Sequence, residues 1–141
     1  MAIAHEDIIA IFNKVKFPYN ISKPTAAIAH KALDNIHLME ANAKSILEQK
    51  QRIIEELKKL PTVRKIFPSD SNFILLRIDH AQKIYKKMAS EKGVVIRYQG
   101  NKIHCKDCVR ITVGTPEQNR VLLDTLKKTV AEIGDTQNGC I

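Results

Sequence analysis

The segment GVVIRYQGNKIHCKDCVRITVGTPEQN, from Gly93 to Asn119, decides the fold assignment. It contains two short apolar runs, Val94 to Tyr98 and Val109 to Val113, and each run has one arginine near its centre. Short apolar runs bounded by glycine and polar residues predict β-strands. A charged side chain is costly inside a buried strand, so the positions of Arg97 and Arg110 need a reason.

Strand alternation suggests where the two arginines point. Successive side chains of a strand lie on opposite faces of the sheet. In each run three apolar residues share one face: Val94, Ile96 and Tyr98, and Val109, Ile111 and Val113. If helices cover these apolar faces, Arg97 and Arg110 project from the other side, where a ligand or another domain could contact them. The alternative is that both arginines only solvate an exposed sheet face.

The surrounding sequence predicts an ordered series of helices and strands. The predicted elements are helices at Ile8 to Val15, Thr25 to His37 and Ile46 to Leu60, strands at Val63 to Phe67 and Asn72 to Ile78, a helix beginning at Asp79, the two strands above, and a last helix from Thr115. Ser22 is a predicted helix N-cap, and the pairs Asp79 with Gln82 and Thr115 with Gln118 match the capping-box pattern. The expected fold class is a two-layer α/β sandwich, with helices on one face of a small mixed sheet.

Composition limits the class of protein. A chain of 141 residues with 44% apolar content is long and apolar enough to bury one core. No apolar run reaches the length of a membrane span, and the first residues lack the pattern of a signal peptide. Three cysteines do not make a disulfide framework. We expect a cytoplasmic protein without a membrane partner.

The net charge of +8 raises the alternative of a nucleic-acid-binding module. Most of the excess positive charge lies between Lys83 and Arg110, a segment that contains eight basic residues and two acidic ones. Such a patch would attract RNA or another polyanion, but only Tyr85 and Tyr98 are available there for base stacking. We therefore expect no nucleic-acid partner, and keep an independent basic α/β module as the alternative function.

Cys105 and Cys108 have the spacing of half a zinc site, with His104 beside them. A structural zinc site needs four ligands, and the remaining cysteine is Cys140, near the end of the chain. A local disulfide is another possibility for this pair, although a reducing cytosol disfavours it. No metal site and no catalytic residue is predicted in this chain.

Four stretches carry a resemblance to a known family, in this order: PYNIS (Pro18 to Ser22), SNFILLRI (Ser71 to Ile78), GVVIRYQGN (Gly93 to Asn101) and CVRITVGTPEQN (Cys108 to Asn119). Together they resemble the C-terminal part of the histidinol-phosphate aminotransferase family, over about Ile8 to Ile133. These are fold type I enzymes that use pyridoxal 5'-phosphate (PLP). The resemblance implies transfer of an amino group between histidinol phosphate with 2-oxoglutarate and imidazole-acetol phosphate with glutamate, in histidine biosynthesis.

The same resemblance implies roles for individual residues. It assigns Arg110 to the substrate carboxylate and Arg97 to the substrate phosphate, and guanidinium suits both because it donates two parallel hydrogen bonds. It assigns Asn72 a supporting role in the site, with a strand-start turn residue as the alternative. Tyr19 and Asn20 match the segment that links the two domains of the family.

One departure from the family is large. The family's cofactor lysine lies in a Ser-Lys motif followed by Gly-Leu-Ala-Gly, whereas Ser22 and Lys23 are followed by Pro-Thr-Ala, in a different part of the alignment. We therefore expect a fragment that is inactive alone, from a parent that is a homodimer and binds PLP in the missing large domain. Residues 1–38 are then linking helices from the end of that large domain, 39–134 the small C-terminal domain, and 135–141 a flexible tail.

Overall fold

The structure, a computed structural model, describes residues 3–18 and 21–138. Contacts divide the chain into two compact units, residues 1–39 and 40–141. Tyr19 and Asn20 lie outside the described residues. The assignment of the first unit as linking helices of a larger domain stays a prediction.

The first unit contains two short helices, α1 (Glu6–Val15) and α2 (Lys23–Asp34). The Ser22 hydroxyl accepts a hydrogen bond from the Thr25 backbone N–H at 3.3 Å, which confirms the predicted cap of α2. None of the residues described in these two helices is buried. This unit therefore has no core of its own, and its apolar side chains remain accessible.

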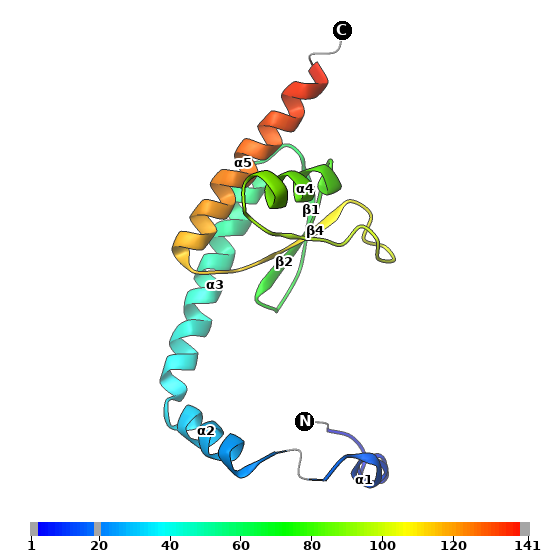
Figure 1. Cartoon of the computed structure of the whole chain (residues 1–141), viewed down its shortest axis with the longest axis vertical. Coiled ribbons are helices and arrows are strands. Elements are labelled where there is room, and N and C mark those ends of the chain that lie inside the picture. Colours follow the sequence, from blue (N-terminus) through cyan, green and yellow to red (C-terminus); the bar gives the residue numbers. More distant parts are fainter. Residues whose placement is uncertain (1–2, 19–20, 139–141) are drawn as a thin grey trace. The chain divides into compact units, whose positions relative to one another are not determined.

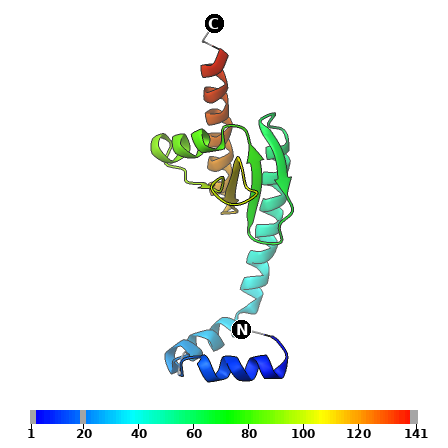
Figure 2. The same ribbon diagram turned by 90° about the vertical axis from the view of Figure 1, so that its right-hand side faces the viewer.

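The second unit combines helices with a small sheet (Figure 1). Its elements are the later part of α3 (Ile36–Lys58), then β1 (Val63–Phe67), β2 (Phe73–Ile78), α4 (Ala81–Glu91), β3 (Arg97–Tyr98), β4 (Cys108–Thr112) and α5 (Pro116–Asn138). The strand order in the sheet is β1-β2-β4-β3. Figure 2, turned by 90°, shows the strands in front of α3 and α5.

All described strand pairs are antiparallel, so the expectation of a mixed sheet was wrong in this detail. The connection from β2 through α4 to β3 does produce two parallel strands. They are not neighbours, because β4 lies between them and pairs with both. The insertion of β4 thus turns an apparent parallel unit into an antiparallel sheet.

The core lies between one face of this sheet and the three helices. The fully buried residues include Ile74, Leu76 and Ile78 of β2, Val109 and Ile111 of β4, and Ile53, Leu57, Ile84, Met88 and Leu126 of the helices. Alternate residues of β2 are buried and half-buried, as expected when helices cover only one side. The two-layer α/β sandwich with helices on one face is confirmed.

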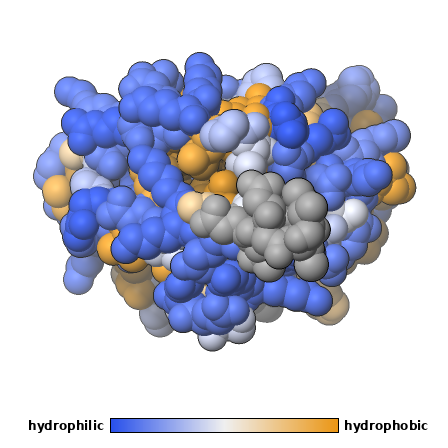
Figure 3. Space-filling view, turned by 90° about the horizontal axis from the view of Figure 1, so that it is seen from above, coloured by the Kyte–Doolittle hydropathy of each residue, from blue (hydrophilic) through white to orange (hydrophobic). Residues whose placement is uncertain are grey.

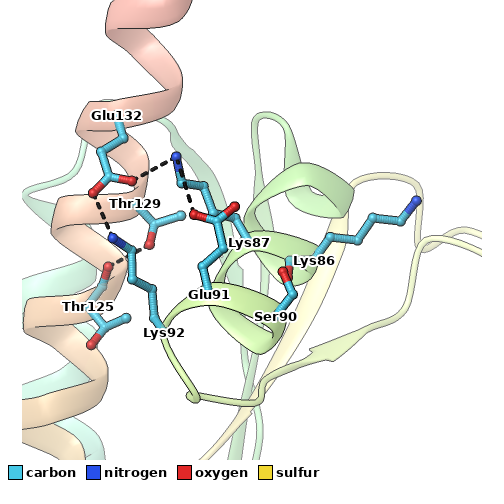
Figure 4. A network of polar contacts seen from close by, with 8 residues as sticks. All are labelled: Lys86, Lys87, Ser90, Glu91, Lys92, Thr125, Thr129 and Glu132. Carbon is cyan, nitrogen blue, oxygen red and sulfur yellow. Dashed lines mark hydrogen bonds and ion pairs between the residues drawn. The ribbon is translucent and has the colours of Figure 1, made fainter.

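The C-terminal helix begins as predicted. Thr115 and Gln118 cap it reciprocally: the Thr115 N–H donates to Gln118 Oε1 at 3.0 Å, and the Gln118 N–H donates to Thr115 Oγ1 at 3.3 Å. The helix α5 continues to Asn138 and so includes part of the segment predicted as a tail. Glu132 of α5 is bound to Lys87 at 2.8 Å and to Lys92 at 3.0 Å, which ties α5 to α4 and to the residue after it (Figure 4).

The predicted capping box at Asp79 was wrong. The helix α4 begins at Ala81, and its N-cap is His80, in the left-handed conformation with φ 58° and without a side-chain cap bond. The Asp79 carboxylate instead accepts a hydrogen bond from Arg64 Nε at 2.9 Å, and this contact lowers the pKa of Asp79. Asp79 therefore lies before the N-cap, and its side chain binds β1 rather than the first turn of α4.

The strand predicted from Val94 to Tyr98 is shorter than expected, because only Arg97 and Tyr98 join the ladder. The Val94 N–H donates to the Met88 carbonyl at 3.1 Å, and Gly93 between them has φ 67°. This is the pattern of a helix C-terminus closed by a left-handed glycine. The first residue of the predicted strand therefore completes the end of α4.

Candidate functional site

The face of the sheet opposite the helices carries the two arginines of interest. In the register of β3 and β4, Arg97 and Arg110 are direct Cα partners. Direct partners in a sheet lie on the same face. Val109, which precedes Arg110 in β4, is buried in the core, so Arg110 points to the opposite face. Arg97 and Arg110 are therefore neighbours on the face that the helices leave open.

Arg110 is held in place by an aromatic ring. It is half-buried, and its guanidinium carbon lies 5.2 Å from the centroid of the Phe73 ring on β2. Its Nε is buried and has no hydrogen-bond partner in the described part of the chain. A buried N–H donor without a partner is costly, so this atom is an unsatisfied donor beneath the open face.

Arg97 has a different environment. It is exposed and lies on the short edge strand β3. None of the ion pairs among the described residues includes Arg97 or Arg110. Within the described residues, neither guanidinium group is paired with a carboxylate, so both can bind an external anion.

Two further cations lie on this open face, and the sequence interpretation missed them. Arg77 of β2 pairs with Lys65 of β1, and both lie near the ring of Phe67, at 5.9 Å and 5.0 Å from its centroid. The face of Arg77 could have been predicted from the sequence, because Arg77 has the same strand parity as Phe73 and the opposite parity to the buried Ile74. The face of Lys65 could not have been predicted in this way, because it depends on how β1 pairs with β2.

Asn72 is not brought to the two arginines by strand alternation. It precedes β2, it is exposed, and its parity is that of Ile74, which is buried on the helix side. Its backbone carbonyl accepts a hydrogen bond from the Val113 N–H at 2.9 Å, which extends the ladder between β2 and β4 by one residue. A substrate-binding role for its side chain stays a prediction.

The turn after β4 is fixed by a buried amide. Asn119 is 4% exposed; its Oδ1 accepts from the Gly114 N–H at 2.9 Å, and its Nδ2 donates to the Gly114 carbonyl at 2.9 Å and to Gln49 of α3 at 3.3 Å. The sequence interpretation treated this segment only as a helix cap. The arrangement anchors the end of the strand that carries Arg110.

The buried lysine Lys50 does not fit the role of a PLP lysine. The buried lysine, Lys50, lines a cavity of about 370 Å³ that Asp70 also lines, which superficially suits a cofactor lysine. Its ammonium group donates instead to the backbone carbonyls of Ser69 and of Ser71, the latter at 2.7 Å. A lysine held in this way closes a loop and is not available as a nucleophile.

Two other classes of site can be considered from the described residues. Within them, no group of three or more His, Cys, Asp or Glu side chains could hold a metal ion. No helix in this part of the chain is long and apolar enough to span a membrane. Hydrophilic side chains cover most of the face seen in Figure 3.

Comparisons with known proteins give independent evidence on the family of this chain. The family model described as "Aminotransferase class I and II" matches residues 1–126. A histidinol-phosphate aminotransferase from Cytophaga hutchinsonii is 42% identical over 126 residues, which are 89% of this chain and 36% of that relative. The chain therefore spans about a third of the length of the curated relatives it matches.

Solved structures agree with the fold. The histidinol-phosphate aminotransferase from Clostridium acetobutylicum matches with a TM-score of 0.78 and 27% identity, over 86% of this chain and 37% of that one. The enzyme of that name from Sinorhizobium meliloti, solved in complex with PLP, matches with a TM-score of 0.70 and 21% identity, over 87% of this chain and 34% of that one. The second match supports the fold alone.

Proposed function

Because the chain belongs to the class I and II aminotransferase family, we propose that it is the C-terminal part of a histidinol-phosphate aminotransferase. The parent enzyme would transfer an amino group between histidinol phosphate with 2-oxoglutarate and imidazole-acetol phosphate with glutamate. The observation that carries this proposal is the pair of unpaired arginines on the open face of the sheet, since every one of these substrates is an anion.

The two arginines supply the binding of these anions. Direct partners in an antiparallel pair have Cα atoms about 4.5–5.5 Å apart, so two long side chains can reach one phosphate. Arg110 binds the carboxylate of glutamate or 2-oxoglutarate, and Arg97 lies beside it to bind the substrate phosphate. Histidinol phosphate has no carboxylate, so its phosphate takes that anionic role and is shared by Arg97 and Arg110.

The cofactor of this proposal is PLP, which the family uses as an electron sink. Since Lys50 does not fit the role and the family's lysine motif has no match here, the lysine and the cofactor pocket would belong to the larger domain of the parent. The contribution of this chain is to hold the anionic ends of the substrate. The parent is proposed to be a cytoplasmic homodimer, and the isolated chain to be inactive.

The test is an assay of the complete enzyme that contains this region, with histidinol phosphate as amino donor and 2-oxoglutarate as acceptor. The expected result is stoichiometric formation of glutamate. Activity with other amino donors but none with histidinol phosphate would retain the family and reject the substrate. If no longer coding sequence with a cofactor lysine exists, the alternative of an independent polyanion-binding module is favoured. Binding of RNA by the 141-residue chain that persists at physiological salt would support it.

A further inference from the structure

Cys105 and Cys108 lie at the two ends of one tight turn that leads into β4. The Cys108 N–H donates to the Cys105 carbonyl at 3.0 Å, and Asp107 between them has φ 56°. The first and last Cα atoms of such a turn are less than about 7 Å apart. Disulfides bridge Cα atoms roughly 4.4–6.8 Å apart, so the turn brings the two Cα atoms to a separation that a disulfide can span.

The two thiols differ in access and in neighbours. Cys105 is half-buried, whereas Cys108 is fully buried at the start of β4, opposite Arg77 in the register. The Lys106 carbonyl accepts a hydrogen bond from the Cys108 thiol at 3.5 Å and one from Arg77 Nε at 3.2 Å. A guanidinium group therefore lies beside the buried thiol, and it favours the thiolate form.

We propose that Cys105 and Cys108 are a redox-active pair that peroxides oxidise to a local, reversible disulfide. The sulfur of Cys105, the more accessible thiol, attacks one oxygen of the peroxide; the O–O bond breaks, one water leaves with the thiol proton, and a sulfenic acid forms. The sulfur of Cys108 then attacks the sulfur of Cys105, the S–O bond breaks, and a second water leaves. Two thiols are oxidised by two electrons, and hydrogen peroxide is reduced to two waters.

The reverse step needs a low-molecular-weight thiol such as glutathione. Two such thiols reduce the disulfide and become one disulfide themselves, which restores both cysteines. A bond across so short a turn suits a labile, transient disulfide better than a permanent structural one. Burial raises the pKa of the Cys108 thiol, with Arg77 opposing the effect, which agrees with Cys105 as the first thiol to react. This chemistry needs neither the cofactor nor the substrates of the proposed function.

The experiment uses the full chain with Cys140→Ser, so that only the two thiols of the pair remain. The protein is treated with hydrogen peroxide, unreacted thiols are alkylated, and intact mass and peptide mass spectra are recorded. We expect a monomer about 2 Da lighter, with neither thiol alkylated and a cross-link between Cys105 and Cys108. Glutathione should restore two alkylatable thiols. Persistent alkylation of both cysteines, or cross-links only between chains, would overturn the proposal.

Single variants test the order of the steps. In the same background, Cys108→Ser should leave Cys105 as a sulfenic acid that dimedone traps, because the resolving thiol is gone. Cys105→Ser should react at least tenfold more slowly, since the remaining thiol is buried. Cys108→Ala serves if the serine variant loses its circular dichroism spectrum. Equal oxidation rates in the two single variants would reject Cys105 as the attacking thiol and, with it, the proposed sequence of steps.

Discussion

Arg97 and Arg110 are direct partners across β3 and β4, on the side of the sheet opposite α3, α4 and α5. They are not equivalent. Arg110 is half-buried on an inner strand and lies over the ring of Phe73, whereas Arg97 is exposed on the edge strand. An anion bound between them therefore meets one rigidly placed guanidinium group and one adjustable group, and their substitutions should have different effects.

In the complete enzyme, Arg110→Ala should impair both half-reactions, because both involve an anionic group at this position. Loss of a charged hydrogen-bonding partner costs on the order of 2 to 4 kcal/mol, or roughly thirty- to a thousand-fold in kcat/KM. Arg110→Lys should recover only part of this loss, since lysine lacks the forked geometry. The measurement is kcat/KM for each half-reaction, with thermal unfolding as a control for misfolding.

Arg97→Ala should weaken the reaction of histidinol phosphate more than that of glutamate, because only the former brings a phosphate to the edge strand. Arg64→Ala is a matched control, since Arg64 is an exposed strand arginine that is paired with Asp79. Small and equal losses for both substrates in the Arg97 and Arg110 variants would mean that these arginines only solvate the sheet.

The common face of these two arginines was predictable because strand parity is a local property of Gly93 to Asn119. The neighbours of each strand were not, since they depend on pairing between distant segments. The placement of β4 between β2 and β3 therefore corrected the sheet type and placed Arg110 of β4 over Phe73 of β2. The cap at Asp79 failed for a similar reason, because its actual partner, Arg64, lies on another strand.

The isolated chain, mixed with PLP and glutamate, should form no 2-oxoglutarate. Its buried lysine, Lys50, is bound to two backbone carbonyls and cannot act as the cofactor lysine. Borohydride reduction followed by peptide mass spectrometry should find PLP scattered at low occupancy over exposed lysines. A single site at full occupancy that reacts with glutamate would show that the chain is catalytic by itself.

The free 141-residue chain should self-associate through α1. Ile8, Phe12 and Val15 recur at helical spacing and are 45%, 52% and 76% exposed, although Ile9 beside them is half-buried. Sedimentation velocity over a range of concentrations should reveal dimers or larger species, and Phe12→Asp should weaken the association about tenfold. Asn13→Asp adds the same charge to α1 away from this stripe and should change little. A monomer at all concentrations would contradict the prediction.

The stability of the fold should decrease in acid through Glu56. Hydrogen bonds from Lys127 of α5, at 2.6 Å, and from Lys59 lower the pKa of Glu56 from 4.5 to about 2. A carboxyl group whose pKa is lower in the folded state stabilises that state fully above its unfolded pKa, and the stabilisation is lost as the pH falls through the folded pKa.

Glu56→Gln should therefore lower the Tm by a few degrees at most at pH 7, because the pair is partly exposed. The difference from the wild type should shrink below about pH 4.5 and vanish near pH 2. Thermal unfolding followed by circular dichroism over this pH range provides the measurement. Glu48→Gln removes the same charge from an exposed position of α3 and should show no such profile. A difference that does not vary with pH would contradict the role of Glu56.

The turn that ends β4 should depend on the side chain of Asn119. Asn119→Ala would leave the buried N–H and carbonyl of Gly114 without their amide partner, at an expected cost of about 2 kcal/mol in the free energy of unfolding. Gln49→Ala removes only the 3.3 Å bond to α3 and should cost less. Asn101→Ala, at an exposed loop position, should stay within about 0.5 kcal/mol of the wild type. Chemical denaturation of the three variants gives these values; if Asn119→Ala unfolds like the wild type, the Thr115–Gln118 cap alone holds the turn.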